Sequence, residues 1–276
     1  MFPPLRGCSC RTIILAVAVL LTCGLSPSAL AQQSYSSTGN RPDDSIRLFQ
    51  RFIQDGAITP HVWLEGQARF QSNSPIFNGD EAERRLLGTI LALGLTEDLE
   101  IGLTLGVVSL DPDNGGSESG LSDMQIYAKY RINELPLSVT LGGIVKIPTA
   151  DEDEGLGTGE VDIEGFIAVR KSYGHVDLIG NGGVRFNQDP EIGDIDGRTS
   201  ILLGGGVIIA MTQTVFNTWE LNFESKRYER TDSSTTLTPG LMWRVGDRGL
   251  IRAGIGIGLT DGAPDFEAIG GFVLSY

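Results

Sequence analysis

The sequence predicts an all-β protein, a transmembrane antiparallel β-barrel of about twelve strands. Three observations lead to this prediction. From Thr59 onward, apolar and polar side chains alternate with a period of two in segments of about ten to thirteen residues. The connections between these segments alternate between tight turns and longer polar loops. The chain then ends in an alternating strand, Ala268–Tyr276, whose last residue is aromatic.

Residues 1–31 have the features of a cleavable secretory signal. Arg6 and Arg11 precede an uncharged run over residues 12–25, and Ala29-Leu30-Ala31 supplies small residues at the expected cleavage site. A lipid anchor at Cys23 is the alternative, but the residues before it fit a lipid-attachment box poorly. The sequence therefore predicts export, with cleavage after Ala31.

Composition excludes several classes of function. All three cysteines lie inside the predicted signal, so the mature chain is expected to form no disulfide, thiol-dependent active site or cysteine metal site. The net charge of −14 disfavours nucleic acid as a partner. Because no later stretch has the roughly 18 apolar residues of a spanning helix, membrane insertion would require a closed barrel.

Residues 32–58 form the predicted periplasmic N-terminal segment. Its first residues are mostly Ser, Gln and Gly, and Ile46, Phe49, Phe52 and Ile53 then follow at helical spacing, with Gly56 as a stop. This spacing indicates a short amphipathic helix over residues 43–54. The favoured interpretation places the helix against the periplasmic rim, and the alternative is a plug at the barrel mouth.

Residues 59–276 form the predicted barrel. Its expected strands are Thr59–Gln71, Glu83–Leu95, Leu99–Leu110, Leu121–Ile132, Leu137–Ile147, Glu160–Lys171, His175–Asn187, Arg198–Ala210, Val215–Tyr228, Thr235–Val245, Leu250–Leu259 and Asp265–Tyr276. Outer-membrane barrels have short periplasmic turns and longer extracellular loops. An even number of strands places both ends of the barrel on the periplasmic side.

Several strands have one apolar and one charged face. A charge facing lipid near the midplane costs roughly 2–4 kcal/mol, so the charged faces are expected to line the lumen. The orientation of the strand at residues 83–95 stays open, because Arg85 shares a face with leucines. The lumen-lining candidates are Asp123, Lys129, Arg131, Glu160, Asp162, Glu164, Arg170, Arg185, Glu220, Glu224 and Arg252.

A soluble sandwich or lipocalin-like barrel is the alternative architecture, because it also uses alternating strands. In that case the aliphatic faces of all twelve strands would have to share one core. The run Ile251–Leu259 instead places glycines opposite isoleucines, which suits a barrel interior that stays open or admits bulkier neighbours.

The terminal strand carries the expected assembly signal. Phe272, Leu274 and Tyr276 share its apolar face, as in the carboxy-terminal signature of bacterial outer-membrane barrels. This strand is expected to pair with Thr59–Gln71, since a barrel in lipid can leave no open edge. The barrel-assembly machinery of a Gram-negative bacterium is the expected partner in folding.

The most distinctive stretch is Lys146–Asp162, a strand that ends in Lys-Ile-Pro-Thr and continues through an acidic loop and a Leu-Gly-Thr-Gly run. It resembles the outer-membrane transporter family associated with phenol-degradation (meta-cleavage) pathways. Gly120–Arg131 resembles that family's Gly-Leu-Gly-Asp strand, with Ser122 in place of the second glycine. Asn40–Asp43 is similar to its amino-terminal Asp-Arg-Pro motif. The resemblance implies a barrel that moves small, often hydrophobic molecules.

Neither metal chemistry nor catalysis is predicted. The acidic residues Asp151–Glu154 offer oxygen ligands for Ca²⁺ or Mg²⁺, but they lack the spacing of a dedicated site, so no metal and no cofactor are expected. An enzyme would need a positioned base. The only imidazoles, His61 and His175, begin strands on the periplasmic side and have no Ser-rich motif beside them.

The sequence therefore predicts a porin-like channel or transporter for small, hydrophobic or aromatic molecules in the bacterial outer membrane. Outer-membrane lipid and lipopolysaccharide are its expected surroundings, and the substrate stays unknown. The second hypothesis is a sealed barrel with a structural, adhesive or lipopolysaccharide-contact role.

Overall fold

The computed structural model describes residues 44–49, 53–59, 61–76, 78–112, 115–132, 137–191 and 194–276. The predicted signal, the motif at Asn40–Asp43 and the turn at residues 133–136 lie outside the described residues. Within the described part of the chain, no helix is both long enough and apolar enough to span a membrane.

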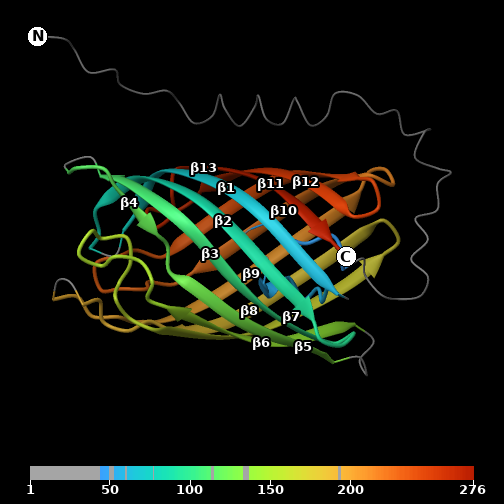
Figure 1. Ribbon diagram of the computed structural model, residues 1–276, viewed down its shortest axis with the longest axis horizontal. Helices are drawn as coiled ribbons and strands as arrows, with labels where there is room; N and C mark the ends of the chain where they lie inside the picture. The colour runs from blue at the N-terminus through green and yellow to red at the C-terminus, as the bar shows by residue number, and fades with distance from the viewer. Residues whose placement is uncertain are drawn as a thin grey trace, which may run out of the picture. The chain divides into compact units, whose positions relative to one another are not determined.

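The described residues form one antiparallel sheet that closes on itself (Figure 1). Its strands are β1 (Val62–Pro75), β2 (Glu81–Gly94), β3 (Leu99–Pro112), β4 (Glu118–Leu121), β5 (Met124–Ile132), β6 (Ser138–Ile147), β7 (Asp162–Tyr173), β8 (Val176–Phe186), β9 (Thr199–Ala210), β10 (Val215–Glu224), β11 (Ser234–Val245), β12 (Gly249–Gly258) and β13 (Phe266–Ser275). β4 and β5 both pair with β3, at opposite ends, and so share one position in the barrel. The fold is thus the predicted twelve-stranded antiparallel barrel.

The seam between the first and last strands closes as predicted. β1 pairs with β13 from Trp63 opposite Ser275 to Ser72 opposite Phe266. Aromatic rings cover glycines directly across several strand pairs. A Cβ added at Gly66 would lie 2.6 Å from the Phe272 ring. A Cβ added at Gly102 would likewise clash with the ring of Tyr127, which lies directly opposite. Such pairs fill the space above the glycine and favour one register.

The charged faces of the strands point into the lumen. β7 alternates strictly, with Asp162, Glu164 and Arg170 buried and Ile163 and Ile167 exposed. β5 and β10 follow the same rule, as the sequence predicted. The open question of β2 is also settled, because Leu87 and Arg85 face outward and Ile90 and Ala92 are buried. A continuous apolar exterior, with the charged side chains turned inward, rules out the soluble alternative.

The exterior carries aromatic residues at both ends. Tyr130, Tyr173, Trp243 and Tyr276 are each more than half exposed and lie near the end of the barrel that carries the short turns. Phe186 and Phe266 are exposed at the other end, where the longer loops lie. Such girdles lie at the two interfaces of a membrane.

Several predicted boundaries are wrong, and the first strand begins at Val62 rather than Thr59. β1 continues to Pro75, and β2 already begins at Glu81. The connection between them is therefore shorter than the loop at residues 72–82 that the predicted strand ends imply. β10 ends at Glu224 rather than Tyr228, because the chain turns there and Ser200 donates a hydrogen bond to the Lys226 carbonyl at 3.2 Å. The strand predicted at residues 121–132 is broken at Ser122-Asp123. There the Thr149 hydroxyl donates a hydrogen bond to the Ser122 carbonyl and accepts one from the N–H of Met124.

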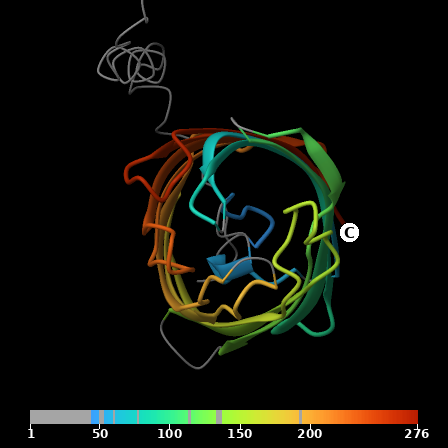
Figure 2. The same ribbon diagram turned by 90° about the vertical axis from the view of Figure 1, so that its left-hand side faces the viewer.

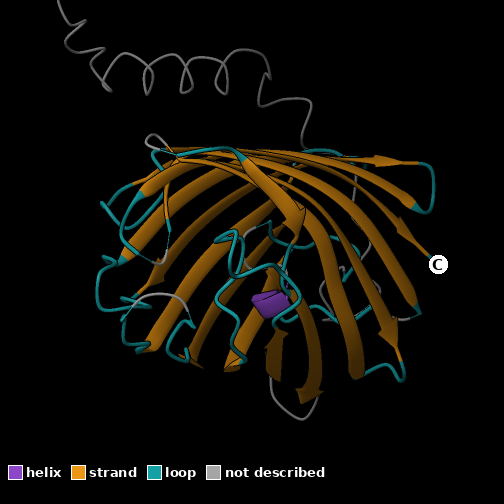
Figure 3. Cartoon of the chain, turned by 60° about the vertical axis from the view of Figure 1, so that its left-hand side comes forward, coloured by secondary structure: helices purple, strands orange, loops and turns teal. Residues whose placement is uncertain are grey.

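Residues 44–49 and 53–59 lie inside the barrel (Figures 2 and 3). The favoured prediction of a helix against the rim is wrong for the described residues. Residues 44–49 form a turn and an extended stretch, and only η2 (Ile53–Asp55) is helical, as a 3-10 turn. The helical spacing of Ile46, Phe49 and Ile53 instead reflects side chains that point to several walls of the lumen.

Candidate functional site

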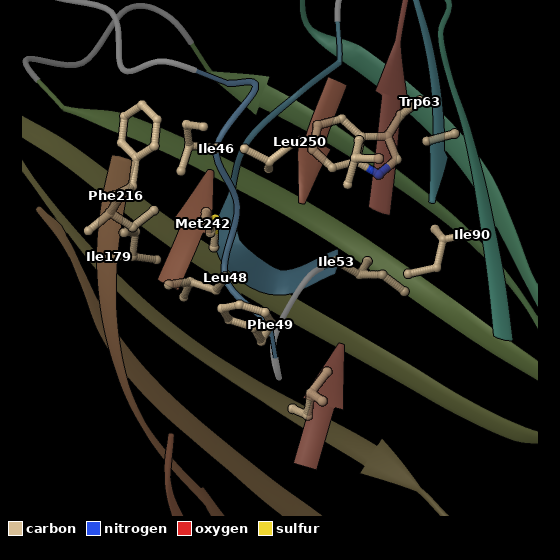
Figure 4. Close-up of a cluster of buried hydrophobic side chains, with 14 of the residues drawn as sticks. Ile46, Leu48, Phe49, Ile53, Trp63, Ile90, Ile179, Phe216, Met242 and Leu250 are labelled. Atoms are coloured by element: carbon tan, nitrogen blue, oxygen red, sulfur yellow. The ribbon is translucent and has the colours of Figure 1, made fainter. Parts of the chain in front are cut away.

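The N-terminal residues form a plug in the lumen, which we call the inner segment and define as residues 44–49 and 53–59. Ile46, Leu48, Phe49 and Ile53 are buried, and they belong to one apolar cluster with inward-facing residues of the wall (Figure 4). The wall members include Trp63 of β1, Phe216 of β10, Met242 of β11 and Leu250 of β12. This cluster is the hydrophobic core of the molecule, and it lies inside the barrel.

Glycines in the wall make room for the inner segment. A Cβ added at Gly206 of β9 would lie 2.8 Å from Leu48, and one added at Gly240 of β11 would lie 2.5 Å from Phe49. Both distances are shorter than real Cβ contacts, so these glycines are needed for the backbone to approach the two side chains. The lumen glycines thus admit bulkier neighbours, as the sequence indicated.

Glu100 of β3 is the main polar anchor of the inner segment. Its carboxylate accepts two hydrogen bonds from the Arg47 guanidinium, at 2.8 and 3.1 Å. The Lys129 ammonium lies 3.2 Å away, the Tyr127 hydroxyl donates at 3.0 Å, and the backbone N–H of Thr59 also donates to it. Arg47 stacks on Trp63, with 4.5 Å between its guanidinium carbon and the ring centroid. This buried carboxylate joins both ends of the inner segment to the wall.

The Glu100 carboxylate stabilises the charged form of the Arg47 guanidinium. Burial alone disfavours a charged guanidinium and lowers its pKa. The neighbouring charge of Glu100, with its hydrogen bonds, outweighs burial, so the pKa of Arg47 is raised. Arg47 and Glu100 therefore form a fully charged pair that is shielded from solvent.

Further polar contacts attach the inner segment around the whole wall. The contacts are Asp44 to Arg131 at 2.6 Å, Asp55 to Arg170 at 3.8 Å, the Leu48 carbonyl to Arg252 at 2.7 Å, the Gln54 amide to Glu164 at 2.6 Å, the Gly56 carbonyl to Thr140 at 2.9 Å, and the Phe49 N–H to Glu220. These wall residues come from β5, β6, β7, β10 and β12. The inner segment is thus held from most sides of the barrel.

A polar cavity of about 570 Å³ occupies the half of the lumen toward the longer loops. Phe49, Ile53 and Gln54 of the inner segment line it, and inward-facing side chains of the strands form its walls. Residues 155–158 of one loop and Tyr228, Thr231 and Asp232 of another also line the cavity. Figure 2 shows loops turned inward over the lumen at this end.

Carboxylates and cations pair along the cavity walls. Glu164 accepts from the Arg185 guanidinium at 2.7 Å, and Arg185 also donates to Glu224 at 2.6 Å. Asp162 lies 2.8 Å from the Lys146 ammonium, and Glu267 lies 3.1 Å from Arg69. Such a lining offers a solute both charge and hydrogen-bonding groups.

The two motif stretches fold together at the rim of this cavity. Lys146 contacts Asp162 and also Asp123, at 3.4 Å, and its ammonium donates to the Thr158 hydroxyl at 2.6 Å. Asp123 accepts hydrogen bonds from the backbone N–H groups of Thr149 and Ala150. The motif residues thus hold the loop after β6 against the cavity, which is a positioning role.

The lumen-lining candidates divide into two groups and one exception. Six candidates contact the inner segment: Lys129, Arg131, Glu164, Arg170, Glu220 and Arg252. Asp123, Asp162, Arg185 and Glu224 line the cavity, as does Glu164. Glu160 lies in the loop before β7, partly buried, and does not line the cavity. Phe272 and Tyr276 are exposed on the outer face of the seam, and Leu274 is partly buried there.

Sequence reasoning missed Glu100, Arg69 and Arg84. In β3, Glu100, Gly102 and Thr104 lie on one face of the strand, and Ile101 and Leu105 lie on the other. The sequence of this strand therefore carries the same alternation of polar and apolar residues as β7. The sequence offered a plug only as the alternative, since the contacts of the inner segment join residues far apart in the chain and no local pattern records them.

Among the described residues, no group of three or more His, Cys, Asp or Glu side chains could hold a metal ion. His61 and His175 are exposed at the short-turn end, outside the lumen cavity.

Comparison with known proteins agrees with the fold. Residues 50–276 match the family model described as "Putative MetA-pathway of phenol degradation". No curated protein sequence matches the chain.

The chain is also similar to solved barrel structures. The COG4313 outer membrane channel from Pseudomonas putida F1 is 15% identical, with a TM-score of 0.62 over 83% of this chain and 100% of that chain. The NanC porin is 11% identical, with a TM-score of 0.53 over 77% and 98% of the two chains. A KdgM porin in complex with disordered oligogalacturonate is 9% identical, with a TM-score of 0.50 over 78% and 99%. The fold is therefore that of outer-membrane channels.

Proposed function

Because the chain belongs to the family described as "Putative MetA-pathway of phenol degradation", we propose that it is an outer-membrane channel for small, hydrophobic or aromatic molecules. The observation that carries the proposal is a closed barrel with an apolar exterior and a solute-sized cavity in its lumen. Pockets for small molecules have volumes of roughly 300–1,000 Å³, and this cavity lies in that range.

The barrel spans the outer membrane with its longer loops outside the cell. The two aromatic girdles mark the membrane interfaces, and outer-membrane barrels carry short turns on the periplasmic side. In this orientation the cavity opens toward the exterior, and the inner segment lies on the periplasmic side of it. Residues 1–31 serve as a signal that is removed on export.

Passage depends on the inner segment. Its apolar side chains fill the lumen on the short-turn side of the cavity. Without them, twelve strands would leave a narrow pore there. A solute from outside first enters the cavity and then meets Phe49, Ile53 and Gln54. Passage therefore requires the inner segment to shift or leave the lumen.

The protein acts by passage rather than by chemistry. The carboxylates of the lumen are engaged by cations or by the inner segment, which supports a structural and selective role for them. The exposed positions of His61 and His175 support the same view, since neither faces a solute in the cavity.

Planar bilayers and liposomes test the proposal. The purified full chain is expected to give ion conductance and to admit small solutes such as phenol into liposomes. A variant that lacks residues 44–58 should conduct more strongly. Absence of conductance and uptake in both proteins would overturn the channel proposal and favour the sealed barrel.

A further inference from the structure

Arg84 stands out among the charged groups of the cavity. It points inward from β2, is partly buried and lines the cavity near the longer loops. Its cross-strand neighbours are Gln71 of β1 and Leu110 of β3. The guanidinium of Arg84 makes no hydrogen bond or ion pair with any residue that the structure describes.

The nearest carboxylates are occupied by other groups. Glu267 accepts from Gln71 at 3.0 Å and pairs with Arg69 at 3.1 Å. Asp123 pairs with Lys146 and accepts two backbone N–H groups of the loop after β6. An arginine has five N–H donors and cannot lose its charge at ordinary pH, so Arg84 has unused capacity for an anion.

Two further arginines face the same cavity. Arg69 of β1 lies diagonally across the strand pair from Arg84, and Arg227 reaches the cavity from the loop after β10. The positive charges of both act on Arg84. Six carboxylates of the described residues line the same cavity, but each is paired with a lysine or arginine. The guanidinium of Arg84 is therefore the group that can favour a carboxylate or phosphate over a neutral solute.

The wall beside Arg84 is apolar. Leu86, Leu110, Leu156 and Ile76 line the cavity and belong to one hydrophobic cluster. Leu110 lies directly opposite Arg84, and Leu86 follows it on the same face of β2. A ligand whose anionic group meets Arg84 would thus lay its body against aliphatic side chains.

We propose that the cavity binds small amphipathic carboxylates, with Arg84 as the ligand of the carboxylate and the aliphatic wall as the surface for an apolar or aromatic body. This inference rests on the proposed channel function, of which it names the solute class. Arg69 and Arg227 strengthen the attraction, and their own acidic partners keep them in place.

Binding to the folded full chain tests the site without requiring transport. The probe is benzoate, titrated calorimetrically into protein in a non-ionic detergent, with benzyl alcohol as a neutral analogue and inorganic phosphate as an anion without an apolar body. Benzoate is expected to bind more tightly than either. The Arg84→Gln variant should lose about tenfold in benzoate affinity, as expected for one charged hydrogen-bonding partner, and Arg84→Lys should retain part of it.

Arg85→Gln is the matched control, because Arg85 is the next residue of β2 and faces the exterior, where it pairs with Glu83. It should bind benzoate as the unchanged protein does. Equal benzoate affinity in Arg84→Gln, absence of benzoate binding, or phosphate binding as tight as benzoate binding would overturn the inference.

Liposome uptake separates this inference from the channel proposal. If the protein admits benzyl alcohol and benzoate, the Arg84→Gln change should reduce benzoate uptake alone. Uptake of both solutes with no effect of Arg84→Gln would contradict the carboxylate site and leave the channel standing. Benzoate binding that depends on Arg84 without uptake of any solute would support the site and contradict the channel.

Discussion

Glu100 shows how a single residue can decide where a segment lies. Its side chain is fully buried, and its two oxygens are shared among Arg47, Lys129, Tyr127 and the N–H of Thr59. Burying charges is costly, and breaking such a pair by removing one partner costs about 3–5 kcal/mol, since the other charge stays buried. The contribution of Glu100 is therefore mainly to the position of the inner segment.

The variant Glu100→Gln is expected to release the inner segment. It leaves the charges of Arg47 and Lys129 uncompensated and should destabilise the docked segment by about 3 kcal/mol. Arg47 has no exposed surface in the docked state. Trypsin should therefore cut after Arg47 much faster in the variant, which mass spectrometry of the fragments will show.

Glu83→Gln is the control for this experiment, because Glu83 is a partly exposed carboxylate that pairs with Arg85 outside the lumen. It should be cut at the rate of the unchanged protein. Equal protection of Arg47 in Glu100→Gln would show that the carboxylate does not hold the segment.

The inner segment and the strands that receive it form a matched set at the scale of elements. Leu48 and Phe49 fit against glycines of β9 and β11, while Arg252 of β12 covers the Phe49 ring at 4.2 Å from its centroid. The strands thus have two tasks. Their outer faces meet lipid, and their inner faces are shaped for one specific segment of the same chain.

The variant Gly240→Val is expected to displace Phe49 without opening the barrel. The added Cβ would lie 2.5 Å from the Phe49 ring and 2.7 Å from the Thr218 hydroxyl, both inside the lumen. Loss of Phe49 burial should cost about 1.5–3 kcal/mol of docking energy. Conductance in planar bilayers should rise, and heat-modifiable migration on gels should be retained.

Gly165→Val is the matched control. Gly165 faces outward from β7, and a Cβ added there would meet no neighbouring atom within 4 Å. Its conductance should equal that of the unchanged protein. A rise in both variants would point to a general loosening of the wall, against a specific fit of Phe49.

The seam depends on the last residue of the chain. Tyr276 and Val62 exchange two backbone hydrogen bonds, at 2.9 and 3.0 Å, and the Arg248 guanidinium stacks on the Tyr276 ring. Deletion of Tyr276 removes both bonds, and each contributes about 0.5–1.5 kcal/mol in water and more in lipid. Assembly into heat-modifiable barrel should fall sharply, whereas Tyr276→Phe should assemble normally. Normal assembly of the deletion variant would contradict this role.

The strands could be predicted from the sequence because their information is local. β7 places Asp162, Glu164 and Arg170 on its inner face and Ile163, Ile167 and Val169 on its outer face. The strands β3 to β13 begin or end within a few residues of the predicted positions where no loop contact intervenes. The errors at residues 121–123 and 225–228 arise where the distant side chains of Thr149 and Ser200 bond backbone groups at these positions. The plug was only the alternative prediction for the inner segment, since its position depends on Glu100, Gly206 and Gly240, which no local pattern connects with it.

The whole molecule is asymmetric along the barrel axis. The half toward the short turns is filled by the inner segment, and the other half holds the cavity under the inward-turned loops (Figures 2 and 3). In the proposed orientation, solutes reach the Arg84 side first. The direction of the barrel in the membrane therefore decides on which side the selective site lies.

Cysteine labelling tests the orientation in whole cells. The mature chain has no cysteine if the predicted signal is removed, so single cysteines give a clean signal. Asp151 is exposed in the loop after β6, and Asp247 is exposed in a short turn, so a cysteine at either position should be accessible to a label. A membrane-impermeant maleimide should label Asp151→Cys on intact cells and Asp247→Cys only after lysis. The reverse pattern would invert the proposed orientation.

In the proposed function, the inner segment closes the periplasmic half of the channel. Single-channel conductance of the full chain, compared with a variant that lacks residues 44–58, tests this claim most directly. We expect the variant to assemble as a heat-modifiable barrel and to conduct several times more strongly than the full chain. Equal conductance of the two assembled proteins would contradict the claim.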